Sequence, residues 1–113
     1  MSVLAEIKKG VVIIVLQGRF LGMEDNNEFR GLVDENMAAG FRRFVVDFAD
    51  IEWIDSAGIG TIIASQMSVG KKEGDLRMAR LTDRVAYYFD LCNLDAIFKR
   101  YPTVHEAVDS FYL

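Results

Sequence analysis

The chain has 113 residues, a net charge of −4 and 51% hydrophobic residues, which suits a single domain over residues 1–113 and excludes a disordered tail. The negative charge and the scattered basic pairs argue against nucleic-acid binding. One cysteine, Cys92, leaves no internal disulfide, and no apolar run approaches the roughly 20 residues that span a bilayer, so we expect a cytoplasmic protein without membrane insertion.

The first 40 residues predict a hairpin followed by a helix. Val3–Lys8 alternates apolar and polar residues, and Val11–Gln17 is almost wholly apolar, which is typical of an outer strand and a deeper one. Gly18–Gly22 is expected to be a short loop. Carboxylates then indicate a helix start at Glu24, and Gly40 ends the helix. The apolar face of this helix comprises Phe29, Leu32, Val33 and Met37.

A strand, a central loop, a second helix and another strand are expected next. Phe44–Phe48 predicts the first of these strands, and the loop runs from Trp53 to Gly60. The second helix ends near Lys72, and Leu76–Leu81 alternates as a strand. The apolar stripe of the second helix comprises Ile59, Ile62, Ile63 and Met67.

The last third predicts two capped helices and an edge strand. Thr82 suits the cap of a third helix, Ile97-Phe98 a short edge strand, and Thr103–Glu106 the capping box of a final helix. The residues expected to face inward are Val85, Tyr88, Phe89, Cys92, Val104, Ala107, Val108 and Phe111. The order β-β-α-β-α-β-α-β-α predicts an α/β fold with a mostly parallel or mixed sheet of about five strands and four helices.

The residues alone leave two roles open for Ser56. Asp55-Ser56 stands between a strand and a helix, where a side chain can cap the first helical N–H groups or an anion such as phosphate can bind. Gly58 and Gly60 each cost a helix about 1 kcal/mol relative to alanine. A purely structural loop gains nothing from this cost. A surface that docks another protein does gain, because small residues let the partner approach the start of the helix.

Catalysis is not expected. The only histidine, His105, lies in the last predicted helix, and no spacing suggests a triad with Ser56. One histidine and one cysteine do not make a metal site, and Gly58-Ile59-Gly60 is too short for a nucleotide loop. We therefore expect no enzyme activity, no metal and no cofactor.

Ile54–Gly60 resembles the signature loop of STAS domains, and specifically of bacterial anti-sigma factor antagonists. The resemblance covers nearly the whole chain. It includes Val11–Gly18, Phe44–Asp50, Leu94–Phe98 and Thr103–Phe111, in the order that the family shows.

The resemblance implies a regulatory protein that binds an anti-sigma factor which is also a serine kinase. It implies that the kinase phosphorylates Ser56, that the complex is then lost, and that a serine phosphatase acting on phospho-Ser56 restores it. We expect the free protein to be a monomer. The expected partner-binding residues are Leu21, Met23, Glu24, Trp53, Ile54, Asp55, Ser56, Ala57, Gly58, Ile59 and Gly60.

One departure from the family keeps alternatives open. The family usually has an aspartate soon after the second strand, but Gly18–Gly22 has none, and Glu24 and Asp25 come later. The second hypothesis is therefore a non-phosphorylated STAS subunit of a larger signalling or lipid-transport assembly. A third, from another class, is a small enzyme or nucleotide-binding protein.

Overall fold

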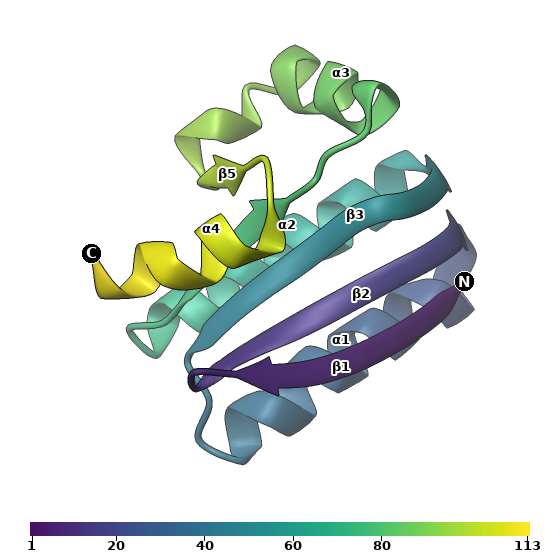
Figure 1. Ribbon diagram of the computed structural model, residues 1–113. Helices are drawn as coiled ribbons and strands as arrows, with labels where there is room; N and C mark the ends of the chain where they lie inside the picture. The colour runs from purple at the N-terminus through teal and green to yellow at the C-terminus, as the bar shows by residue number, and fades with distance from the viewer.

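The computed structural model describes residues 1–113 and has one five-stranded sheet with helices on both faces (Figure 1). The sheet order is β1-β2-β3-β4-β5; β1 runs antiparallel to β2, and the other pairs are parallel. The elements are β1 (Ser2–Lys8), β2 (Val11–Phe20), α1 (Gly22–Ala38), β3 (Arg43–Ile54), α2 (Ser56–Lys71), β4 (Asp75–Ala79), α3 (Asp83–Leu91), η1 (Leu94–Ala96), β5 (Arg100–Tyr101), α4 (Val104–Asp109) and η2 (Ser110–Tyr112). The predicted α/β class, element order and mixed sheet are confirmed.

Two hydrophobic cores lie on the two faces of the sheet. Alternate residues of β2 point to opposite faces, so Val12 and Ile14 join the larger core with residues of α1, α2 and α3. Val11 and Ile13 join a smaller core with Ala107 and Val108 of α4. Figure 1 shows α4, in yellow, across the front of the sheet, with α1 and α2 behind it.

The two central strands are longer than the sequence predicted. Arg19 and Phe20, expected in a loop, belong to β2, and β3 continues to Ile54 instead of stopping at Phe48. These extensions pair in parallel, with Arg19 opposite Trp53 and Phe20 opposite Ile54 after register shifts. Because the two strands end side by side, the supposed central loop shrinks to a single residue before α2.

The predicted apolar stripe of α2 is confirmed at Ile59, Ile62 and Ile63, which lie in or against the larger core, and is wrong at Met67. Met67, expected inside, is 59% exposed, whereas the polar residues Ser65 and Gln66 are buried. Gln66 Oε1 accepts a hydrogen bond from Leu76 N at 2.8 Å, and its Nε2 donates to Asp75 Oδ1 at 2.6 Å. These bonds join α2 to the start of β4 and leave Met67 on the surface. No helix in the molecule combines the length and the apolar content needed to cross a bilayer.

Two predictions in the last third are wrong, and both caps are confirmed. Ile97-Phe98 is not a strand, because Phe98 turns into the larger core and the edge strand forms at β5. Cys92 is exposed at the end of α3, where Phe89 occupies the buried side. Thr82 Oγ1 accepts from the third N–H of α3 at 3.3 Å, and Thr103 Oγ1 accepts from the corresponding N–H of α4 at 3.0 Å.

Candidate functional site

The site begins with the single residue that joins β3 to α2. Asp55 is extended, and its Oδ1 accepts a hydrogen bond from Gly58 N at 2.7 Å, so it caps the helix. Its carbonyl oxygen accepts from Ile59 N at 3.1 Å. Ser56 is therefore the first helical residue and not the cap, and it is exposed. Of the two roles that the sequence left open for Ser56, capping belongs to its neighbour.

The same carboxylate reaches a segment far away in the sequence. Asp55 Oδ2 accepts from Gly22 N at 3.3 Å, where α1 begins. Asp55 N in turn donates to Phe20 O at 3.2 Å. Asp25 Oδ2 also accepts from Leu21 N at 2.8 Å, which holds the turn between β2 and α1. The starts of α1 and α2 thus lie together at the carboxyl ends of two parallel strands.

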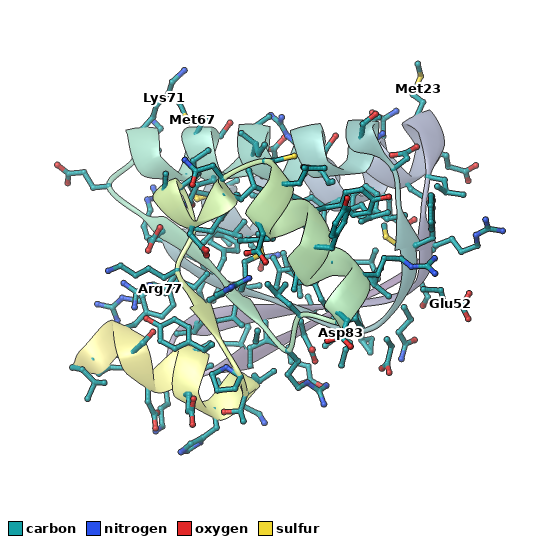
Figure 2. All side chains as sticks on the ribbon, turned by 90° about the horizontal axis from the view of Figure 1, so that it is seen from above. Met23, Glu52, Met67, Lys71, Arg77 and Asp83 are labelled. Carbon is teal, nitrogen blue, oxygen red and sulfur yellow. The ribbon has the colours of Figure 1, made fainter.

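Most residues predicted to bind a partner are accessible at this end of the molecule. Met23 is 77% exposed and projects away from the start of α1 (Figure 2). Glu24, Ser56, Ala57 and Gly60 are also exposed. The structure thus brings the residues predicted from two distant segments to one surface.

Gly58 and Ile54 lie beneath this surface. A Cβ on Gly58 would stand 2.8 Å from Phe20 Cδ1 and 2.9 Å from Ile54 Cγ1, so a side chain there would collide with the core. Ile54 itself is only 2% exposed. Close packing therefore requires a glycine at position 58, and the expectation that Gly58 serves only a docking surface is wrong. At Gly60 an added Cβ would meet nothing within 4 Å.

Trp53 and Ile59 flank the site in half-buried positions. The guanidinium of Arg84, on α3, lies 4.9 Å from the centre of the Trp53 ring, an arrangement that favours cation–π attraction. Arg19 is the neighbour of Trp53 across the sheet. Neither arginine could be predicted from sequence spacing, because strand pairing places Arg19 beside Trp53 and the return of α3 places Arg84 over its ring.

The groups needed for catalysis are not brought to Ser56. His105 lies on α4, on the opposite face of the sheet, with Nε2 3.0 Å from Asp109 Oδ2. A hydrogen bond from Lys9 lowers the pKa of Asp109. No group of three or more histidine, cysteine, aspartate or glutamate side chains could hold a metal ion. The exposed serine is left as a group on which another protein can act.

An ion pair at the edge of the smaller core supports the strands that carry the site. Arg80 donates from Nε to Asp47 Oδ1 at 3.0 Å and from Nη2 to Asp47 Oδ2 at 2.6 Å. The carboxylate is buried, and its hydrogen bond raises the pKa of Arg80. This bidentate pair ties β3 to the segment after β4.

Comparisons with known proteins agree with this arrangement. A family model for the STAS domain matches residues 2–107. A Thermotoga neapolitana protein, named as a homologue of an anti-sigma factor antagonist, is 30% identical over 99 residues, covering 87% of this chain and 88% of that protein.

Solved structures are similar over almost the whole length. The crystal structure of a Thermotoga maritima protein named as an anti-sigma factor antagonist has a TM-score of 0.87 and 26% identity, covering 98% of this chain and 95% of that one. Unphosphorylated SpoIIAA has the same fold, with a TM-score of 0.83, 18% identity and coverage of 98% and 96%.

Proposed function

The chain belongs to the STAS domain family, and we propose that it is an anti-sigma factor antagonist whose binding is switched off by phosphorylation of Ser56. The observation that carries the proposal is the place of Ser56. It is exposed at the first position of α2, while Asp55 performs the capping. The serine is thus free for another protein to modify. The relatives named as anti-sigma factor antagonists supply the class of partner.

The partner in this proposal is an anti-sigma factor that is also a serine kinase. It contacts the surface made by Met23, Glu24, Ser56, Ala57 and Gly60, with Trp53 and Ile59 at its margin. Aromatic and methionine side chains are common at interface centres, and Met23 offers an apolar group to a pocket on the partner. The kinase transfers the γ-phosphoryl group of ATP to Ser56 Oγ and releases ADP and the hydroxyl proton. A serine phosphatase then hydrolyses the phosphoserine to serine and inorganic phosphate.

The domain keeps its fold after modification. A phosphoserine carries about −1.5 to −2 charges, and the positive end of the α2 dipole favours negative charge at its first turn. Because Ser56 is outside both cores and does not cap α2, its modification removes no core contact and no capping bond.

The complex, in contrast, is strongly weakened. A phosphate oxygen roughly 5 Å from a partner carboxylate costs about 3 kcal/mol per unit charge at an effective dielectric of about 20. That cost is about a hundredfold in affinity. Charge alone therefore suffices for the switch, and the free protein remains a monomer throughout.

The experiment is incubation with the cognate anti-sigma factor and ATP, followed by intact-mass and peptide mass spectrometry. We expect one added phosphate, on Ser56. The Ser68→Ala variant, changed on the same helix, remains a substrate, whereas the Ser56→Ala variant does not. Phosphate on the Ser56→Ala protein would refute the assignment of the site.

The alternative, a non-phosphorylated STAS subunit, rests on the missing aspartate between Gly18 and Gly22. In this chain Asp25 lies beside that turn and binds Leu21 N. Affinity capture from the source cell separates the two functions. Recovery of a transporter ATPase or a large signalling complex, in place of an anti-sigma kinase, would favour the alternative.

A further inference from the structure

We propose that Asp55 is a positioning residue, through which a negative charge on Ser56 changes the conformation of the turn between β2 and α1. In this proposal, which rests on the proposed phosphorylation, a phosphate on Ser56 breaks the hydrogen bond from Gly22 N to Asp55 Oδ2 and frees residues 22–24. Met23 and Glu24 then leave the positions in which the unmodified protein presents them.

The two oxygens of Asp55 hold unequal bonds. Oδ1 accepts from Gly58 N at 2.7 Å within the start of α2. Oδ2 accepts from Gly22 N at 3.3 Å, across 33 positions of sequence. The bond from Gly58 lies at the short end of the usual range of about 2.7–3.2 Å, and the bond from Gly22 lies beyond its long end. The bond to Gly22 is therefore the first to yield when Asp55 is disturbed.

Phosphorylation disturbs Asp55 directly. The phosphate is on the adjacent residue, and its charge repels the carboxylate. The phosphate oxygens also compete for the N–H groups of the first turn of α2, which have no intrahelical acceptors. A small rotation of Asp55 away from the phosphate lengthens the bond to Gly22 past hydrogen-bonding distance.

The backbone of the turn between β2 and α1 can change conformation at Gly22. Gly22 has a φ of +73°, in the left-handed region that favours glycine. A second bond, from Leu21 N to Asp25 Oδ2 at 2.8 Å, holds the residue before it. Gly22 O accepts a hydrogen bond from Asn26 Nδ2 at 2.7 Å within α1, so Gly22 moves together with the first turn of α1 while β2 stays in place. The exposed Met23 side chain, with no core contact to retain it, moves with them.

The test uses the full chain with phosphoserine placed at position 56 by genetic-code expansion, so that no kinase is needed. Amide resonances and hydrogen exchange are recorded by NMR. We expect the Gly22 amide to exchange about tenfold faster, as loss of a charge-assisted hydrogen bond implies, while the Gly58 amide stays protected. Phosphoserine at position 68, about 18 Å along the same helix, leaves Gly22 unchanged.

The Asp55→Asn variant separates positioning from capping. Its amide oxygen still caps Gly58, but its NH₂ group cannot accept from Gly22. Its Gly22 amide therefore exchanges rapidly from the start, and phosphoserine at position 56 adds less than twofold. A wild-type Gly22 amide that changes less than twofold would overturn the proposal. That result would leave the proposed function intact if partner binding is still lost. Partner binding unaffected by a freed Gly22 would instead overturn the function alone.

Discussion

Replacing Gly58 by alanine tests whether this glycine serves the core. The new methyl group would stand 2.8 and 2.9 Å from carbons of Phe20 and Ile54, well inside ordinary contact distance. Overpacking of this kind costs about 1–3 kcal/mol, and the better helix propensity of alanine returns up to about 1 kcal/mol. With the full propensity gain, we expect a net loss of about 0–2 kcal/mol, or up to roughly 8 °C in Tm for a domain of this size.

Gly60→Ala is the matched control, because a methyl group there meets nothing within 4 Å. Only the propensity term acts, so this variant gains up to about 1 kcal/mol. The assay is urea unfolding followed by circular dichroism and by the fluorescence of Trp53, the only tryptophan. Equal stabilisation by both substitutions would refute the close packing of Gly58. It would then favour a role for Gly58 in partner binding.

Three further predictions concern the cap, the buried amide and a surface carboxylate. Asp55→Ala lowers the free energy of unfolding by about 1 kcal/mol while Ser56→Ala changes it by less than about 0.5 kcal/mol, and equal losses in urea unfolding would contradict our assignment of the cap. Gln66→Leu lowers the free energy of unfolding by about 1–3 kcal/mol in the same assay, because the amide N–H of Leu76 in β4 loses its acceptor. Unchanged stability would mean that this hydrogen bond makes no net contribution to folding. Lys9→Met raises the pKa of Asp109 toward 3.8, measured by NMR titration of the carboxylate, and a pKa that stays low would assign the effect to His105 instead.

The sign of the Asp109 effect follows from the lowered pKa. A carboxylate whose pKa is lower in the folded protein stabilises the fold above its unfolded pKa of 3.8. That contribution is fully present at neutral pH and is lost as the pH falls through the folded value, so stability depends on this group only in acid. We therefore expect the Lys9→Met substitution to leave the stability difference between pH 6 and pH 8 unchanged.

Local patterns predicted the class and order of the fold. The apolar run from Val11 and the threonine caps at Thr82 and Thr103 depend on neighbouring residues, and all three are confirmed. The lengths of β2 and β3 depend on pairing between strands distant in sequence, with two register shifts that no local pattern reveals. The exposure of Met67 depends in the same way on the hydrogen bonds that Gln66 makes to β4.

The candidate site was predicted in outline and not in detail. The sequence placed Ser56 at the start of a helix, as the structure has it. It did not distinguish Asp55 from Ser56 as the cap, since both residue types cap helices well. The bond from Gly22 to Asp55 joins two segments 33 residues apart, so only the folded chain could show it.

The most direct test of the account is the affinity of the cognate anti-sigma factor for the chain with and without phosphate on Ser56. Isothermal titration is performed with both forms, and circular dichroism checks that both are folded. We predict a loss of about a hundredfold or more in affinity, with no change in the folded signal. Equal affinity of the two folded forms would contradict the claim that charge on Ser56 is the switch.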